Sequence, residues 1–282
     1  MPPMLEELTR VAVEAAKLAG DRLRDRFGDV DLKVRAKAEH DFVTDADQES
    51  EQLIIESIRD RFPEHLVLSE EVGWVGPSES EYRWVIDPLD GTSNFLKGLP
   101  IWSVSIACRD RHQTVAAAVY DPLRDDLFSA TQGSGAYLNG EILRISQRPS
   151  LSDAFLATGF PFRARGALDV YLDIFRQVFL QARGIRRCGS AALDLAYTAA
   201  GTFDGFFEFR LSSWDIAAGE LLIREAGGVI SDLDGEQDFL RSGNVLAGPM
   251  GLHRELLSKV RQFASESRLD DLAPLEEAVI IA

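Results

Sequence analysis

The segment that decides the fold is Trp84–Phe95, which reads WVIDPLDGTSNF. Its first three residues are apolar and predict a short buried strand. Pro88 has no backbone N–H to donate to a sheet, so we expect the strand to stop at Asp87-Pro88. The carboxylates of Asp87 and Asp90 are then expected at the mouth of the strand.

A turn and a helix start follow directly in the same segment. Gly91 permits a tight turn, and Thr92-Ser93-Asn94 supply side chains that commonly cap a helix N-terminus. The free N–H groups at a helix start attract phosphate oxygens, whereas carboxylates attract divalent cations. The segment therefore predicts a place where both a cation and a phosphate are bound.

Composition sets the broad class of the protein. The 282 residues are 45% hydrophobic and 27% charged, which is ordinary for a globular protein. No apolar run reaches the roughly 20 residues of a membrane helix, and there are only two cysteines, Cys108 and Cys188. We therefore expect a cytoplasmic protein that is not bound to a membrane and carries two free thiols.

The charge and the histidines narrow the possible partners. The net charge of −16 disfavours binding to nucleic acid or to anionic membranes. It would also repel a phosphorylated substrate unless hard cations screened the acids. The four histidines, at 40, 65, 112 and 253, lack the paired spacing of zinc sites, so we expect no catalytic zinc.

Periodicity outlines the order of elements. Apolar spacing predicts helices over 4–26 and 47–62, with a strand or extended arm over 30–44 between them and Thr44 or Asp45 as the cap of the second helix. Further helices are expected over 170–182, 190–200, 216–226 and 250–263, and strands over 66–68, 102–108, 114–120, 127–130, 135–138, 205–209, 229–231 and 244–247. Strands grouped in runs with helices between them indicate an α+β fold.

Acids recur where these elements begin or end. Glu70 follows the strand over 66–68, Asp87 and Asp90 lie in the central segment, Asp215 follows Trp214, and Asp47 opens a helix. Each one alone is best explained as a helix cap or a surface charge. Gathered together they would repel one another, unless they surround Mg²⁺ or Mn²⁺.

Several motifs in this order resemble the inositol monophosphatase family, and most closely the bacterial inositol-1-monophosphatases. They cover about residues 5–263 and comprise DFVTDAD (41–47), EE (70–71), DPLDGT (87–92), GFPF (159–162), RRCGSAALDLAY (186–197), WDIAAG (214–219) and EAGG (225–228). The family is magnesium-dependent and lithium-sensitive, and it forms homodimers. The resemblance implies a layered α-β-α-β-α sandwich in one phosphatase domain over 1–263, with two tightly packed subdomains that meet near 145–155. Residues 264–282 would form a C-terminal extension.

The resemblance also implies a set of metal ligands. Glu70, Asp87 and the backbone carbonyl of Leu89 would hold one Mg²⁺, and Asp87, Asp90 and Asp215 would hold a second. Two or three ions are expected in all, with Mn²⁺ as a possible substitute. A carbonyl oxygen among carboxylates suits a hard cation.

Roles in catalysis and substrate binding follow from the same comparison. Thr92, oriented by Asp47, and Glu70 would relay a proton from a metal-activated water, although capping alone also explains Thr92. The implied substrate contacts are Asp90, Gly91, Thr92, Arg186, Gly189, Ala191, Glu208 and Asp215. Arg186 could instead be a surface or interface cation that does not contact the substrate. Ser69 departs from the pattern, because many relatives carry glycine before the paired acids.

These assignments predict a small-molecule phosphate monoesterase that releases myo-inositol and phosphate from inositol monophosphate. The same core could instead act on fructose 1,6-bisphosphate, 3′-phosphoadenosine nucleotides or histidinol phosphate. A non-enzymatic acidic interaction protein is a further alternative, and it would be expected to have lost metal ligands. A Ca²⁺-binding loop at 232–235 is too short to be credible, and a turn is expected there.

Overall fold

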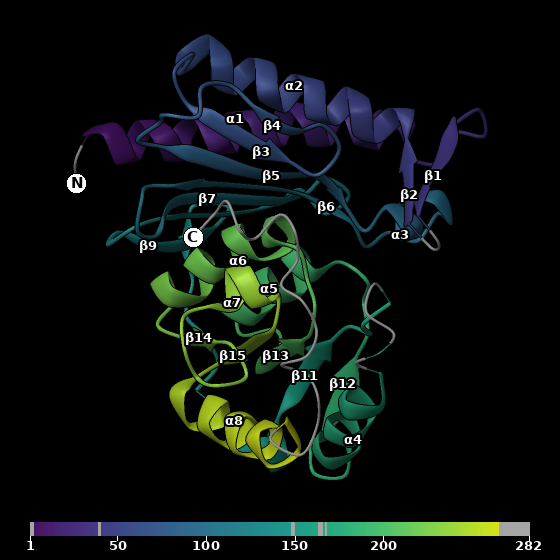
Figure 1. Cartoon of the computed structure of the whole chain (residues 1–282), viewed down its shortest axis with the longest axis vertical. Coiled ribbons are helices and arrows are strands. Elements are labelled where there is room, and N and C mark those ends of the chain that lie inside the picture. Colours follow the sequence, from purple (N-terminus) through teal and green to yellow (C-terminus); the bar gives the residue numbers. More distant parts are fainter. Residues whose placement is uncertain (1–2, 39–40, 148–149, 163–165, 167, 265–282) are drawn as a thin grey trace.

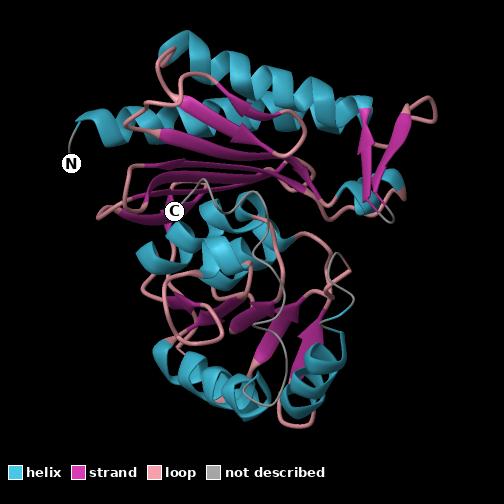
Figure 2. Cartoon of the chain, viewed as in Figure 1, coloured by secondary structure: helices cyan, strands magenta, loops and turns pink. Residues whose placement is uncertain are grey.

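The computed structural model describes residues 3–38, 41–147, 150–162, 166 and 168–264 (Figure 1). The predicted C-terminal extension over 264–282 lies, apart from Ala264, outside the described residues. Layers of helix and sheet alternate along the long axis of the molecule (Figure 2).

The first sheet has eight strands in the order β10-β9-β8-β7-β6-β5-β3-β4. All neighbours are antiparallel except β3 and β5, which confirms the hairpins predicted after the central segment. The strands are β3 Leu66–Ser69, β4 Gly73–Val75, β5 Arg83–Asp90, β6 Ser103–Arg109, β7 Thr114–Asp121, β8 Asp126–Thr131, β9 Gly135–Leu138 and β10 Glu141–Ile142.

Two helices, α1 Pro3–Arg26 and α2 Asp45–Arg61, cover the outer face of this sheet (Figure 1). The inward side of α1 is rich in alanine, so the helix lies close to the strands beneath it. A Cβ atom at Gly20 would come within 2.5 Å of the Tyr120 ring on β7, which explains the absence of a side chain there. The buried apolar residues of both helices and of this sheet face form one core.

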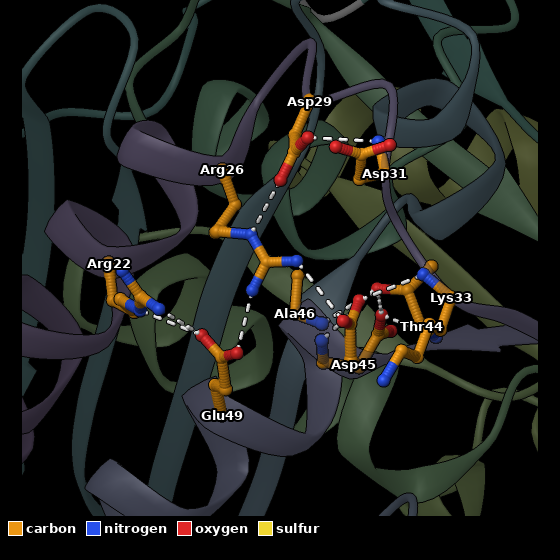
Figure 3. Close-up of polar contacts among 10 residues, drawn as sticks. Arg22, Arg26, Asp29, Asp31, Lys33, Thr44, Asp45, Ala46 and Glu49 are labelled. Carbon is orange, nitrogen blue, oxygen red and sulfur yellow. Dashed lines mark hydrogen bonds and ion pairs between the residues drawn. The ribbon is translucent and has the colours of Figure 1, made fainter.

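Charged contacts join the end of α1 to the start of α2 (Figure 3). Arg26 is only 14% exposed and pairs with Asp29, Asp45 and Glu49 at 3.1, 3.1 and 2.6 Å. Asp45 also accepts a hydrogen bond from the backbone N–H of Lys33. The β1–β2 hairpin, Val34–Ala38 and Asp41–Thr44, leads into this junction, so the position of the first turn of α2 is fixed from outside the sheet.

A middle layer of helices separates the first sheet from a second one. It holds α5 Ala191–Ala199 and α6 Ser213–Glu225, with the short α7 Phe239–Ser242 beside them. Because α6 is covered on all sides, 11 successive residues from Ser213 to Ile223 are buried. A Cβ atom at Gly219 would lie 2.5 Å from Leu195, so glycine allows α5 and α6 to approach closely.

The second sheet has five strands in the order β12-β11-β13-β15-β14, and α4 Leu168–Phe179 and α8 Met250–Ala264 cover its far side (Figure 1). Its strands are β11 Phe155–Thr158, β12 Gly184–Arg186, β13 Gly205–Glu208, β14 Val229–Ser231 and β15 Val245–Gly248, and a 3₁₀ turn over Leu151–Asp153 precedes them. A separate core of buried apolar residues fills the space between these helices and the second sheet. The molecule is thus the expected α-β-α-β-α sandwich. The predicted subdomain boundary near 145–155 falls between β10 and β11, and the division itself remains a proposal.

Two local predictions for the central segment were wrong. Strand β5 does not end at Pro88 but continues to Asp90, with an irregular register between Asp87 and Asp90 that accommodates the proline. Helix α3, Thr92–Leu96, is capped by Gly91 in the left-handed region, φ +97°, and not by the side chains after it. Over the described residues, no helix combines the length and the apolar character needed to cross a membrane.

Candidate active site

A cleft of about 200 Å³ opens where the C-terminal ends of β5 and β13 approach the N-terminal ends of α3, α5 and α6. Ten of the predicted site residues line it: Glu70, Asp87, Leu89, Asp90, Gly91, Thr92, Gly189, Ala191, Glu208 and Asp215. Segments from both sheets and from the middle helices therefore meet at one place.

Three carboxylates form the centre of the cleft. Asp87, Asp90 and Asp215 each offer an oxygen atom, and these atoms all lie within 4.8 Å of one another. The three residues are 2%, 7% and 7% exposed. Buried acids at this spacing require a counter-charge. Because all of the donor atoms are oxygens, the site suits Mg²⁺ or Mn²⁺.

The electrostatics of the cluster agree with that requirement. Burial raises the pKa of Asp87 well above its usual range, and the charges of Glu70, Asp90 and Asp215 raise it further. Burial also raises the pKa of Asp90 to about 6, although hydrogen bonds from Ser190 and Ala192 act in the opposite direction. A bound cation would reverse these shifts.

Local hydrogen bonds hold each of the three carboxylates in place. Asp87 Oδ1 accepts from the N–H of Leu89 at 3.0 Å, within the irregular part of β5. Asp90 Oδ2 accepts from the hydroxyl of Ser190 and the N–H of Ala192, at the start of α5. Asp215 Oδ2 accepts from the N–H of Ser212 at 2.7 Å, at the start of α6. The starts of α5 and α6 and the irregular part of β5 thus hold the three carboxylates in the cluster.

Glu70 and Leu89 lie beside this cluster. Glu70 follows β3, is half-buried in the cleft lining, and its backbone N–H donates to Ile86 O at 3.3 Å. It is outside the group of three that meets within 4.8 Å, but its charge acts on Asp87 and Asp90. The Leu89 carbonyl oxygen lies 3.1 Å from the Thr92 hydroxyl, which can donate its one proton either there or to Asp47, and the carbonyl has a second lone pair for a further partner.

Thr92 and Asp47 are in contact, although 45 residues separate them. The Thr92 hydroxyl lies 3.2 Å from Asp47 Oδ1, while Asp47 Oδ2 accepts from the backbone N–H of Thr44 at 2.9 Å. Thr44 also accepts from the N–H groups of Ala46 and Asp47, which confirms it as the cap of α2. The buried Asp47 therefore serves the cap with one oxygen and faces Thr92 with the other.

Gly91 must be glycine for two reasons. Its φ of +97° lies in the left-handed region, and a Cβ atom would lie 3.0 Å from Ile101 O and 3.3 Å from Gly189 O. The backbone at 91–92 thus approaches the 189–191 turn from the other half of the fold. Both segments line the same cleft.

Glu208 lines the cleft next to Gly159. A Cβ atom at Gly159 would fall within 1.9 to 2.2 Å of the Glu208 carboxyl group. Burial, followed by the charges of Asp194 and Asp215, raises the pKa of Glu208 well above normal, and Arg187 lowers it in part. Glu208 and Gly159 are thus neighbours in the cleft lining.

The structure does not bring Arg186 to the cleft. Arg186 ends β12, is exposed, and its guanidinium carbon lies 4.6 Å from the centre of the Phe155 ring. The next residue, Arg187, lines the cleft instead and lies over Phe162. Side chains alternate direction as an extended chain continues, so a shift of one residue moves the cation from one side to the other.

Other cleft residues were missed by the sequence assignments. They are Ser93, Asn94, Gly159, Phe160, Pro161, Phe162, Arg187, Phe209, Arg210 and Leu211, whereas Ser190 also lines the cleft as part of the turn that was expected to face the polyol. Most of them belong to motifs that carry the family resemblance but had no function assigned to these residues. Their place in those motifs was therefore the only sequence feature that could have indicated them. Arg210 has φ +64°, an uncommon value for a side-chain-bearing residue, and no pattern in the sequence indicates it.

Not every quoted motif lies at the cleft. The carboxylate of Glu225 accepts from the N–H groups of Gly133 and Gly135 at 2.7 and 2.8 Å, so it fixes the β8–β9 turn. Cys108 and Cys188 are free thiols, as expected. Asp232 accepts from the N–H groups of Asp234 and Glu236, which is the predicted turn.

Relatives of known sequence match nearly the full length of this chain. It is 45% identical over 268 residues to a protein named Nus factor SuhB from Escherichia coli K12, covering 95% of this chain and 99% of that one. It is 46% identical over 256 residues to an inositol-1-monophosphatase from Mesorhizobium japonicum, covering 90% and 96% of the two chains.

Solved structures agree with these relatives. The extragenic suppressor protein suhB from Bartonella henselae superposes with a TM-score of 0.88 at 40% identity, covering 91% of this chain and 99% of that one. The inositol monophosphatase from Anabaena gives a TM-score of 0.83 at 35% identity, covering 92% and 97%. A model of the inositol monophosphatase family matches residues 4–266. Because both the fold and the sequence agree along almost the whole length, the chain belongs to the inositol monophosphatase family.

Proposed function

We propose that this protein is a Mg²⁺-dependent phosphatase that hydrolyses inositol monophosphate to myo-inositol and phosphate. The observation that carries the proposal is the buried cluster of Asp87, Asp90 and Asp215, whose oxygen atoms lie within 4.8 Å of one another. These residues fit a hard cation, because they offer only oxygen donors, and burial raises the pKa of Asp87 and of Asp90 where no cation offsets it.

The metal ligands in this proposal are the three aspartates, Glu70 and the Leu89 carbonyl oxygen. Bound Mg²⁺ would lower the pKa of a coordinated water and neutralise charge on the phosphoryl group. Two ions, or three, with Mn²⁺ as a substitute, are consistent with this number of oxygen donors.

Proton transfer in the proposal depends on Thr92, Asp47 and Glu70. The Thr92 hydroxyl, 3.2 Å from Asp47 Oδ1, can pass a proton to that carboxylate as it receives one from the attacking water. Glu70, in the cleft lining, is a second acceptor for the same proton. The backbone N–H groups of Gly91 and Thr92 at the start of α3 would orient the phosphate.

A polyol is the substrate that best suits the rest of the cleft. Glu208 and the Gly189–Ala191 turn provide hydrogen-bonding groups for hydroxyls, and Arg187 adds a cation to the same lining. The partner is thus a small phosphate monoester and not a nucleic acid, since the net charge is −16.

A substrate panel tests this choice. Phosphate release from inositol 1-phosphate is compared with release from fructose 1,6-bisphosphate, 3′-phosphoadenosine 5′-phosphate and histidinol phosphate, at equal Mg²⁺. We expect kcat/KM to be highest for inositol 1-phosphate. If inositol 1-phosphate is turned over slowly and another compound rapidly, the proposed substrate is wrong but the proposed phosphatase activity stands.

We further propose a homodimer that uses the outer face of α4. Leu168, Leu172 and Phe179 are 40%, 44% and 60% exposed, and with the half-buried Phe175 they form one apolar stripe. Sedimentation should give twice the chain mass of 31.2 kDa, and Leu172→Glu should give the single mass. Arg176→Glu, on an exposed position of the same helix, is the matched control. A wild type that sediments as a monomer would exclude the dimer.

A second candidate function follows from the names of relatives. Proteins 45% identical to this chain are called Nus factors, which points to a role as a protein partner in transcription. Asp90→Asn separates the two functions, since it should abolish hydrolysis and leave the protein surface unchanged. Association of this variant with the transcription machinery of the source organism would support the second role. Failure of the wild type to associate would exclude it.

A further inference from the structure

We propose that Glu51 is a positioning residue that holds Glu70 in its place as a metal ligand. The inference rests on the proposed function, because Glu70 acquires this role only if the cleft binds cations. Glu51 lies on α2 and is 3% exposed, a depth at which an unpaired acid is rarely found.

A single oxygen of Glu51 collects three donors from the loop that carries Glu70. Oε1 accepts from the N–H groups of Glu71 and Val72 at 3.2 and 3.1 Å, and from the hydroxyl of Ser69. These donors lie immediately before and after Glu70 in the chain. The charge on Glu51 strengthens all three hydrogen bonds, so the backbone on both sides of Glu70 is fixed to α2.

The same helix contacts two further segments of the site. Asp47, four residues before Glu51, faces Thr92, and the hydroxyl of Ser50 donates to the Pro88 carbonyl at 2.7 Å, between Asp87 and Asp90. Positions 47, 50 and 51 share one face of α2. The start of α2 is itself anchored by Arg26, which Figure 3 shows pairing with Asp45 and Glu49. One helix turn thus sets the relative positions of three segments of the cleft.

Ser69 extends this arrangement. It is 1% exposed and ends β3, and its hydroxyl gives Glu51 a donor that glycine at this position could not supply. Ser69→Ala should therefore weaken the hold on the loop without removing the two backbone donors.

The test is a double-variant cycle read by Mn²⁺ binding, measured by electron paramagnetic resonance on the metal-stripped full chain. Glu51→Gln should raise the Mn²⁺ dissociation constant about 10-fold and Glu51→Ala about 100-fold, the range typical of groups that orient ligands. Glu70→Gln should also weaken binding. If Glu51 acts through Glu70, then adding Glu51→Gln to the Glu70→Gln variant should raise the Mn²⁺ dissociation constant by less than about 2-fold. Full additivity would overturn the proposal.

Amide hydrogen exchange gives a readout that does not depend on metal or activity. The amides of Glu71 and Val72 should exchange about 10-fold faster in Glu51→Gln, and to a smaller degree in Ser69→Ala. Glu56→Gln, an exposed position on the same helix, is the matched control and should change neither exchange nor Mn²⁺ affinity. Wild-type exchange at both amides in Glu51→Gln would overturn the proposal.

The outcomes separate this inference from the proposed function. If the wild type binds no Mn²⁺ and releases no phosphate, the proposed function fails, and with it the role of Glu70 as a ligand. If the wild type is active but Glu51→Gln matches it in Mn²⁺ affinity, only the role of Glu51 fails. Should either Glu51 variant not fold, Ser69→Ala alone decides through amide exchange, and unchanged exchange there counts against the proposal.

Discussion

The Ser190 hydroxyl donates to Oδ2 of Asp90 at 2.5 Å, and so ties the start of α5 to an acid that lies 100 residues earlier on the first sheet. The N–H of Ala192 adds a second bond to the same oxygen at 2.8 Å. The three-carboxylate cluster is therefore assembled between layers and depends on their relative position.

Asp90→Asn should abolish turnover and leave the fold intact. The amide oxygen can still accept from Ser190 and Ala192, but the charge that would hold a cation is gone. We expect kcat/KM for inositol 1-phosphate to fall by about 10²- to 10³-fold or more. The metal-free melting temperature should not fall, since one member of a repelling set is removed. Turnover near that of the wild type at saturating Mg²⁺ would count against the site.

Ser190→Ala should weaken both the cap of α5 and the support of Asp90. The hydroxyl accepts from the N–H of Leu193 and donates to Asp90, so its loss should cost about 1–2 kcal/mol of stability. Mg²⁺ activation should require about 10-fold more metal. Ser93→Ala, at an exposed position of the cleft lining, is the control. Equal Mg²⁺ requirements in the two variants would contradict this prediction.

Stabilisation by Mg²⁺ should increase with pH. Burial raises the pKa of Asp90 from 3.8 to about 6 in the metal-free protein, so the folded state binds the proton more tightly than the unfolded chain does. The resulting contribution to stability is complete below about pH 4 and is lost as the pH rises through about 6. Asp87 shifts in the same direction. A cation can replace the lost proton only when the carboxylates are ionised.

Thermal melts with and without Mg²⁺ at pH 5 and pH 7.5 measure this effect. At a hundredfold excess of metal over its dissociation constant the gain is about 2.7 kcal/mol, or roughly 5 °C for a chain of this size. We expect that gain at pH 7.5 and little of it at pH 5. A gain at pH 5 as large as that at pH 7.5 would contradict the protonation argument.

Gly159→Ala should weaken binding of the substrate polyol and not of phosphate. The added methyl group would overlap the Glu208 carboxyl group, which must then move within the cleft. Loss of a hydrogen bond between the polyol and Glu208 predicts a rise in KM for inositol 1-phosphate of about 10-fold, with inhibition by inorganic phosphate unchanged. An equal loss of phosphate inhibition would show that the whole cleft had been disturbed.

Arg187→Ala and Arg186→Ala form a matched pair of neighbouring substitutions. Both side chains are exposed, but Arg187 lines the cleft, whereas Arg186 lies over Phe155 outside that lining. Steady-state kinetics should give a KM about 10-fold higher for Arg187→Ala and one near the wild-type value for Arg186→Ala. The reverse result would restore Arg186 as the substrate contact.

Much of this site could be predicted because its acids lie where elements begin or end. Apolar runs locate those ends, so Asp87, Asp90 and Asp215 stand out in the sequence, and Thr44 is recognisable as a cap. The path of the chain at Pro88 was not predictable in this way, since an irregular register lets a strand continue past proline.

Other features depend on contacts that no local pattern records. Arg186 and Arg187 differ only in which way an extended chain turns its side chains. Glu51 reads as an ordinary polar position on an amphipathic helix, and its burial follows from the loop that folds over it. Strands β11 and β12 are short, and they form because they pair with segments that are distant in the sequence. A local pattern does not indicate that pairing.

The most direct test of the central claim is the rate of phosphate release from inositol 1-phosphate by the purified protein during chelation and metal repletion. We predict turnover with Mg²⁺, loss of turnover in excess chelator, and recovery when Mg²⁺ is restored, with Asp90→Asn inactive throughout. Turnover that persists in excess chelator, or an equal rate in Asp90→Asn, would contradict the claim that the buried aspartates act by holding a cation.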